Sequence, residues 1–130
     1  GRGRRGRTWH SPFGRNLYLS ISNAFDVGPA QLAGLSLAVG AALVQVLRGL
    51  GVDGIGIKWP NDLVSGRHKL GGILIELQGD TQGPCWAVVG IGLDVNMSAA
   101  GDGAIDQSCA ACRARVRPHR ARRAGDRRRP

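Results

Sequence analysis

A chain of 130 residues is long enough for one hydrophobic core and too short for a second full domain. Its net charge of +9 is uneven: residues 1–7 hold four arginines and no acid, residues 8–100 hold five bases and six acids, and residues 101–130 hold nine arginines and three acids. This distribution excludes a uniformly basic protein and indicates a nearly neutral globular part between two cationic ends.

The first half of the globular part predicts one strand and one long helix. In residues 16–25, leucine and isoleucine at odd positions alternate with tyrosine and serine at even positions, which is the period of a strand with one polar side. After a turn with Pro29 placed for a helix start, apolar residues recur every three or four positions until Gly49 and Gly51. We expect a buried helix of about twenty residues, roughly 30 Å long.

The second half predicts only strands. Residues 55–59 form a short apolar run stopped by Pro60, residues 63–77 read as a hairpin around a turn at 65–68, and residues 85–93 form a further apolar run. Four or five strands and one long helix predict an α+β domain with a mixed, mostly antiparallel sheet packed on that helix.

The chain shows no sign of a membrane or a secretory route. Its longest apolar stretch, residues 32–47, is interrupted by polar and glycine residues and falls short of the ~20 residues that a bilayer span needs. No apolar segment follows the basic start, and three cysteines do not suggest a disulfide framework. We expect a cytoplasmic protein that does not enter a membrane.

Residues 99–130 do not continue the pattern of a folded domain. From Gly101 onward the chain has no Leu, Phe, Tyr or Trp, so it cannot bury enough apolar area to offset the entropy cost of ordering. Cys109 and Cys112 have zinc spacing but no second ligand pair. We expect a disordered basic tail, and we favour a non-native terminus over a basic arm for nucleic acid.

Residues 1–7, GRGRRGR, contain a G-x-G-x-x-G pattern without the preceding strand and following helix of a dinucleotide-binding unit. What remains is a flexible loop of three glycines and four guanidinium groups that suits a phosphate or carboxylate. A solvated basic terminus and an RNA-binding segment are the alternatives.

Three further motifs follow in the strands. KWPNDL at 58–63 presents an amide and a carboxylate at a sheet edge, although an Asn-Asp turn alone would explain it. KLGGIL at 69–74 places a lysine before two glycines that permit a ligand to approach the backbone. GIGLDVN at 90–96 again places glycines inside a strand, where they weaken the sheet unless a ligand needs the room.

Taken in order, these motifs resemble the catalytic domain of biotin protein ligases, the biotin–[acetyl-CoA-carboxylase] ligase family. The resemblance covers residues 1–98, begins inside the family's biotin loop and does not extend into the tail, so we expect a partial catalytic domain there. It implies a class II synthetase-like core and an enzyme that makes biotinyl-5′-AMP and pyrophosphate from biotin and ATP with Mg²⁺. The biotinyl group then passes to a lysine of a biotin carboxyl carrier domain.

The resemblance also implies roles for individual residues. Arg4 and Lys69 match positions that stabilise charge on the biotin carboxylate and α-phosphate, so they are the catalytic candidates. Biotin contacts are implied for Gly1, Arg2, Arg4, Lys69, Gly72 and Gly90. Adenylate contacts are implied for Arg4, Arg7, Trp9, Asn61, Asp62 and Lys69. No metal ligand is assigned, although Asp62 is a candidate partner for the loop or a metal ion.

One residue departs from the family pattern, and one other function remains open. Asp94 stands where the family usually has Asn, and it adds a charge near the nucleotide. The alternative function is a non-catalytic module whose arginine-rich ends bind nucleic acid, with an affinity that falls steeply as salt is added. The ligase prediction instead requires biotin to protect residues 1–9 from proteolysis, and it includes no nucleic-acid partner.

Overall fold

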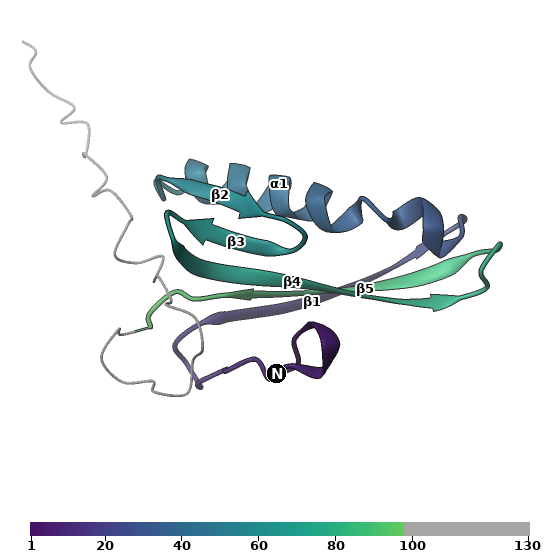
Figure 1. Cartoon of the computed structure of the whole chain (residues 1–130), viewed down its shortest axis with the longest axis horizontal. Coiled ribbons are helices and arrows are strands. Elements are labelled where there is room, and N and C mark those ends of the chain that lie inside the picture. Colours follow the sequence, from purple (N-terminus) through teal and green to yellow (C-terminus); the bar gives the residue numbers. More distant parts are fainter. Residues whose placement is uncertain (98–130) are drawn as a thin grey trace, which may run out of the picture.

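The computed structural model describes residues 1–97, which form one sheet and one long helix (Figure 1). The strands are β1 (Leu17–Phe25), β2 (Ile55–Lys58), β3 (Asp62–Ser65), β4 (His68–Gly79) and β5 (Cys85–Leu93). The helices are α1 (Leu35–Gly49) and two short 3-10 segments, η1 (Arg4–Gly6) and η2 (Pro29–Leu32). The predicted α+β class is confirmed. The predictions for residues 99–130 lie outside the described residues.

The sheet has five strands in the order β1-β5-β4-β3-β2, and each neighbouring pair is antiparallel. The prediction of a mixed sheet is therefore wrong in one respect, because the described residues contain no parallel pair. The connection through α1 explains the difference. It joins β1 to β2, which run in the same direction but lie at opposite edges of the sheet, so these two strands do not pair.

The core lies between α1 and one face of the sheet. Its buried residues come from the helix, the following loop and four strands: Val44, Leu47, Val52, Ile55, Leu63, Leu70, Ile91 and Leu93. Gly40 of α1 lets the helix approach the sheet closely, because a Cβ there would lie 3.3 Å from Cδ1 of Ile57 and 3.5 Å from Cδ1 of Ile73. Each fully buried leucine or isoleucine in such a core contributes about 1.5–3 kcal/mol.

α1 is shorter than the sequence predicts. It spans 15 residues and ends at Gly49 as expected, but residues 29–32 form a separate 3-10 turn. The chain enters this turn at Gly28, which passes so close to the β4–β5 connection that a Cβ would lie 2.6 Å from the Thr81 carbonyl oxygen. The path of the chain at Gly28 thus depends on a contact with residues about fifty positions away. The local spacing of apolar residues therefore cannot predict where α1 begins.

The apolar segment that contains α1 is also longer than the stretch considered above. Residues 29–49, which include η2 and α1, span 21 residues, and an 18-residue window within them has a mean hydropathy of 1.8, enough by length and composition to cross a bilayer. The core helix of a soluble protein passes the same test. α1 packs on β2, β3 and β4, so its inner side belongs to the core described above.

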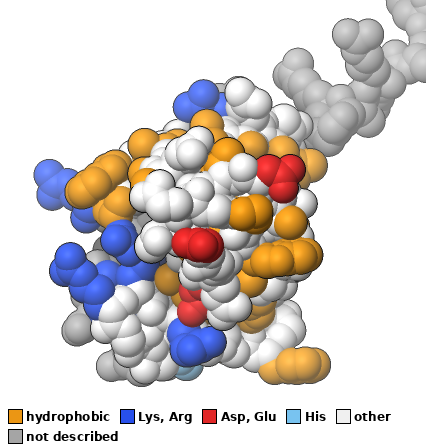
Figure 2. Space-filling model, turned by 90° about the vertical axis from the view of Figure 1, so that its right-hand side faces the viewer, with side chains coloured by type: hydrophobic (Ala, Val, Ile, Leu, Met, Phe, Trp, Pro, Cys, Tyr) orange, Lys and Arg blue, Asp and Glu red, His pale blue; other side chains and the backbone are white. Residues whose placement is uncertain are grey.

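Several large apolar side chains remain exposed around this core. They lie on the outer side of α1 and along β1, and Figure 2 shows hydrophobic side chains at several places on one face of the molecule. On β1 the predicted alternation is present, but its apolar side is not buried by α1: Leu19 and Ile21 are 44% and 51% exposed. Alternation therefore predicted the strand correctly without predicting its burial.

Candidate active site

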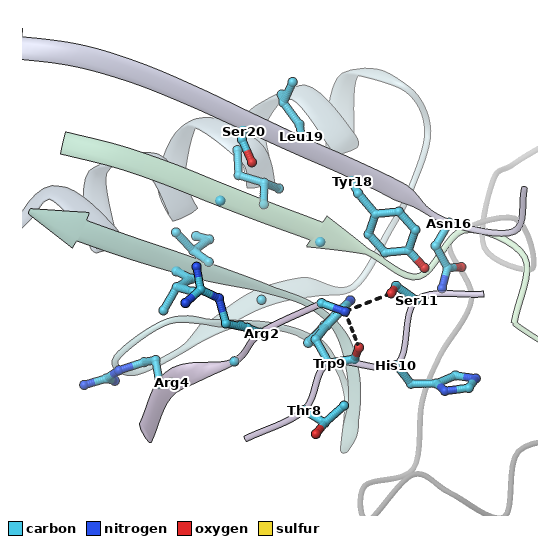
Figure 3. Close-up of a pocket in the computed structure, with 18 of the residues that line it drawn as sticks. Arg2, Arg4, Thr8, Trp9, His10, Ser11, Asn16, Tyr18, Leu19 and Ser20 are labelled. Carbon is cyan, nitrogen blue, oxygen red and sulfur yellow. Dashed lines mark hydrogen bonds between the residues drawn. The ribbon is translucent and has the colours of Figure 1, made fainter. Parts of the chain in front are cut away.

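The face of the sheet opposite α1 is the floor of an open cleft of about 1120 Å³. Its walls come from the N-terminal loop, the start of β1 and the middle of β4 and β5. Figure 3 shows Arg2, Arg4 and Trp9 extending from the loop, and Tyr18 and Ser20 from β1. Every site residue that the sequence predicts, apart from Asp62, lines this cleft: Gly1, Arg2, Arg4, Arg7, Trp9, Asn61, Lys69, Gly72 and Gly90.

The arginine-rich loop is folded back on itself. The Gly3 N–H donates to the Arg7 carbonyl at 2.6 Å, and the Trp9 N–H donates to the Gly1 carbonyl at 2.9 Å. The turn between them requires left-handed backbone, with φ of 56° at Arg5 and 71° at Gly6. An arginine in that conformation costs roughly 1–2 kcal/mol, which a glycine avoids. The loop is thus a small preformed hairpin, and three of its arginines, Arg2, Arg4 and Arg7, line the cleft.

Two glycines that lie opposite each other form the centre of the floor. Gly72 of β4 pairs with Gly92 of β5, and the indole of Trp9 lies over both. A Cβ at Gly92 would lie 2.8 Å from the indole, and a Cβ at Gly72 would lie 3.2 Å from it. Gly90 differs, because its nearest neighbour would be the Leu74 carbonyl oxygen at 3.5 Å, an ordinary contact. The floor therefore has a covered part and an open part.

Lys69 sits at the covered part of the floor. Its Nζ lies 2.7 Å from Oδ1 of Asp62 and 5.3 Å from the centroid of the Trp9 ring. Asp62 reaches it because Asp62 and Gly72 are paired in the β3–β4 register, which places the carboxylate beside the glycine floor. The side chains of Lys69 and Asp62 are 22% and 20% exposed, so this ion pair is partly buried and partly exposed to water.

Asn61 connects the KWPND turn to β4 and to the loop. Its Nδ2 donates to the Ile73 carbonyl at 2.9 Å, and the Ile73 N–H donates to the Asn61 carbonyl at 2.9 Å. Nη1 of Arg4 donates to the remaining amide oxygen at 3.4 Å, a long hydrogen bond. The turn covers residues 59–61, and Asp62 already belongs to β3, so an Asn-Asp turn alone does not explain the motif. The Asn61 amide contacts an arginine 57 residues away in the sequence.

Asp94 lies at the end of the floor and is 6% exposed. Its Oδ1 accepts a hydrogen bond from Nδ2 of Asn16 at 3.2 Å, and the amide oxygen of Asn16 accepts one from the Val95 N–H at 3.0 Å. Asn16 was not among the predicted site residues. Its pairing with Asp94 ties the start of β1 to the end of β5 and fixes the orientation of the buried carboxylate.

Residues 1–96 match the model of the Biotin/lipoate A/B protein ligase family. This chain belongs to that family. It is 48% identical over 107 residues to the bifunctional ligase/repressor BirA of Escherichia coli K12, a match that covers 82% of this chain and 33% of that protein.

Two solved biotin protein ligases show the same fold. The Leishmania major enzyme in complex with biotinyl-5-AMP is 28% identical with a TM-score of 0.67, covering 88% of this chain and 49% of that one. The Aquifex aeolicus enzyme in complex with biotin and ATP is 32% identical with a TM-score of 0.65, covering 85% and 44%. The chain thus spans about a third of BirA and less than half of these ligases.

Within this biotin/lipoate ligase domain, neighbouring motif residues face different sides. The sequence predicts that both glycines of KLGGIL admit a ligand, but this is wrong for Gly71. A Cβ at Gly71 would lie 2.5 Å from the Gly92 carbonyl oxygen and 2.7 Å from Cδ2 of Leu93, so this glycine is needed for packing. Trp59 of KWPND is 77% exposed and is not among the residues that line the cleft.

Several residues that line the cleft are not among the site residues predicted from the sequence. Some had a signal: the even positions of β1 had been predicted to form its polar side, and that side faces the cleft. Gly92 also has a signal as a strand glycine of GIGLDVN, but only the register of β5 against β4 places it opposite Gly72. The additional lining residues include Asn16, Tyr18, Ser20, Leu74, Glu76, Val88 and Gly92.

The acidic residues of the cleft do not form a metal cage. Residues 1–97 contain no group of three or more His, Cys, Asp or Glu side chains placed to hold a metal ion. Asp62 lies nearest to the cationic part, and its carboxylate is already engaged by Lys69. Mg²⁺ in nucleotide sites commonly binds through one or two carboxylates and the substrate phosphates. Within residues 1–97, the donor set therefore fits an ion that arrives with a nucleotide better than one held by the protein alone.

Proposed function

We propose that this chain is the part of a cytoplasmic biotin protein ligase that forms biotinyl-5′-AMP from biotin and ATP. The same enzyme would then transfer the biotinyl group to a lysine of a biotin carboxyl carrier domain. The observation that carries this proposal is the convergence of Arg4 and Lys69 on one cleft with a glycine floor. The solved complexes of related ligases, with biotin and ATP and with biotinyl-5-AMP, support the choice of substrates.

The cleft has a cationic part and an apolar part, which suits biotin. Lys69 lies beside the Gly72–Gly92 pair, while the next two pairs along β4 and β5 are Leu74 with Gly90 and Glu76 with Val88. Successive pairs on one face are about 6.6 Å apart. The bicyclic ring and chain of biotin would lie over Gly90, where the floor is open, and the carboxylate would point to Lys69.

In the first step, a carboxylate oxygen of biotin attacks the α-phosphorus of ATP. The new P–O bond forms as the bond to the β-phosphate breaks, and pyrophosphate leaves with the electron pair. Several negative charges meet at the α-phosphate, so the cations held at the cleft, Lys69 and Arg4, would stabilise the transition state. Mg²⁺ would neutralise further charge on the phosphates.

In the second step, the uncharged amine of the carrier lysine attacks the acyl carbon of biotinyl-5′-AMP. The C–N bond forms, the acyl C–O bond to the phosphate breaks, and AMP leaves while the amine loses a proton to solvent. Arg4 and Arg7, which line the cleft, would retain the adenylate until the carrier arrives, because guanidinium groups bind phosphate through paired hydrogen bonds.

Adenylation by the purified chain tests the proposal. The chain is incubated with biotin, ATP and Mg²⁺, and biotinyl-5′-AMP and pyrophosphate are measured by mass spectrometry and a coupled assay. We expect both products in equal amounts, and we expect biotin to protect residues 1–9 from proteolysis. If neither product forms and biotin gives no protection, the proposal is wrong. Binding of DNA or RNA that weakens steeply with salt would then favour the nucleic-acid module.

A further inference from the structure

Trp9 touches both the floor of the cleft and the lysine that is the candidate for catalysis. We propose that Trp9 is a positioning residue that, together with Asp62, holds the Lys69 ammonium group over the Gly72–Gly92 pair. The role goes beyond lining the adenylate part of the cleft, because it concerns the orientation of another side chain. The contacts that would hold Lys69 lie within the chain and involve no bound ligand.

The indole of Trp9 fits closely against the Gly72–Gly92 pair, and this position is called its seat. Gly72 and Gly92 face each other across β4 and β5, and a side chain at either position would collide with the ring. At Gly92 the collision involves three ring atoms within 2.8–3.0 Å. A ring that occupies such a fitted space has little freedom to move sideways. The backbone of Trp9 is also fixed, because its N–H donates to the Gly1 carbonyl.

Two side chains, Asp62 and Trp9, determine the position of the Lys69 ammonium group. The Nζ of Lys69 lies 5.3 Å from the centroid of the seated ring, within the ~6 Å over which a cation is attracted to an aromatic face. Asp62 holds the same nitrogen at 2.7 Å. One carboxylate oxygen fixes a distance but leaves a long, flexible side chain free to swing around it. The ring supplies a second contact and so restricts the ammonium group to one place.

Packing, and not a hydrogen bond, holds the indole ring of Trp9 in its seat. Nε1 of Trp9 is buried and has no hydrogen-bond partner among the described residues. An unpaired buried donor costs about 1–3 kcal/mol, so hydrogen bonding is not the reason for this seat. The ring is held by contact with Gly72 and Gly92 and by the attraction between its aromatic face and the Lys69 ammonium group. The aromatic face, more than the N–H group, is therefore the property that matters.

Competitive labelling of lysine tests this placement directly. The chain contains two lysines, Lys69 and the exposed Lys58 outside the cleft, so Lys58 serves as a reference within each molecule. An amine-acylating reagent is added at low concentration, and the ratio of Lys69 to Lys58 labelling is measured by mass spectrometry. Trp9→Leu should raise this ratio about fivefold, the factor that corresponds to losing roughly 1 kcal/mol of cation–π contact. Trp9→Phe, which keeps an aromatic face, should raise it less than twofold.

Two glycine variants provide a matched pair that leaves Trp9 in the sequence. Gly92→Ala should displace the ring and raise the labelling ratio as Trp9→Leu does. Gly90→Ala lies two residues away on the same face, where a Cβ makes only ordinary contacts, and should leave the ratio unchanged. Asp62→Asn should raise the ratio and shows that the assay responds. An unchanged ratio in Trp9→Leu, or equal ratios in Trp9→Leu and Trp9→Phe, would overturn the proposal.

The emission of Trp9 gives a second readout. In a chain with Trp59→Phe and Trp86→Phe, Trp9 is the only tryptophan, and the two that are removed are 77% and 58% exposed. Acrylamide should quench Trp9 weakly in this background, several times more strongly after Gly92→Ala, and no more strongly after Gly90→Ala. Strong quenching in the background chain would show that the ring is not seated.

A catalytic consequence rests on the proposed function and is tested separately. If the chain adenylates biotin, Trp9→Leu should lower kcat about fivefold with little change in the KM for ATP. If Trp9 only lined the nucleotide site, its loss would mainly raise the KM for ATP. The labelling experiment contains neither biotin nor ATP. Failure of adenylation would therefore overturn the proposed function and leave the placement of Lys69 by Trp9 untouched.

Discussion

The two faces of β4 and β5 are built from alternate residues of the same strands, yet they differ completely. On the α1 side, Ile73 pairs with Ile91, and both are buried. On the cleft side, the next pair is Gly72 with Gly92, which presents no side chains of its own. Glycine in a strand interior costs roughly 0.5–1 kcal/mol relative to alanine. The core face stabilises the fold, while the cleft face gives up stability to make room, so substitutions on the two faces should have separable effects.

The largest expected effect is on the core face. Leu63 of β3 is fully buried, so Leu63→Ala should lower the free energy of unfolding by about 2–5 kcal/mol through lost burial and a residual cavity. Urea denaturation measures this change. Leu50→Ala is the control, because Leu50 is 65% exposed and its truncation should cost less than about 0.5 kcal/mol. Similar losses in the two variants would contradict the position of the core.

On the cleft face, Lys69→Ala should reduce biotinyl-5′-AMP formation by about 10²-fold, as the loss of one oriented charge-stabilising group often does. Its free energy of unfolding should fall by no more than about 1 kcal/mol, because the lost ion pair is partly exposed. Lys58→Ala removes the other lysine from an exposed position and should leave adenylation unchanged. Initial rates of pyrophosphate release compare the three proteins. Normal rates in Lys69→Ala would remove Lys69 from the mechanism.

Two glycines separate the faces most directly. Gly71→Ala places a methyl group 2.5 Å from a backbone oxygen on the packed side and should destabilise the fold by about 1–3 kcal/mol. Gly90→Ala meets only ordinary contacts, so its stability should stay within about 1 kcal/mol of the parent. Its affinity for biotin should fall about tenfold, because the methyl group enters the open floor. Thermal unfolding measures the stability, and isothermal titration calorimetry measures the affinity for biotin. If Gly90→Ala destabilised the fold and Gly71→Ala weakened biotin binding instead, Gly71 would belong to the cleft face and Gly90 to the core face.

The smallest expected effect concerns the contact between the loop and the sheet. Asn61→Ala removes the hydrogen bond to the Ile73 carbonyl and the acceptor for Arg4. We expect a loss of about 1 kcal/mol and cleavage within residues 1–9 that is about fivefold faster in limited proteolysis. Asn23→Ala on exposed β1 should alter neither quantity. Unchanged cleavage in Asn61→Ala would show that Asn61 does not hold the loop.

Most of the fold could be predicted from local patterns. The period of two in residues 16–25, the turn at 65–68 and the apolar run at 85–93 all correspond to observed strands and their connections. The start of α1 could not be predicted in this way, because Gly28 follows the path imposed by Thr81. The apolar pattern continues through residues 29–34 although α1 begins only at Leu35.

Site residues that belong to a sequence motif could be predicted. Those that reach the cleft only through the pairing of two strands could not. Arg4, Lys69 and Asn61 belong to recognisable motifs, and the structure places all three at one cleft. Asn16 carries no distinctive local signal, and GIGLDVN marks Gly92 as a strand glycine without indicating that Gly72 lies opposite it. Gly71 and Gly72 are identical in sequence and adjacent, yet one packs against Leu93 and the other against Trp9.

The residue pattern alone decides which segments become strands, where the turns fall and which family the motifs resemble, since these depend on neighbours within a few positions. Only the tertiary structure determines on which face of the sheet each glycine lies and which side chains contact Lys69. Arg4 and Asn61, 57 residues apart, meet only because the strand order brings β3 and β4 beneath the loop. A shift of one residue in the β4–β5 register would send Gly92 to the core side and remove the seat of Trp9, because side chains alternate between faces.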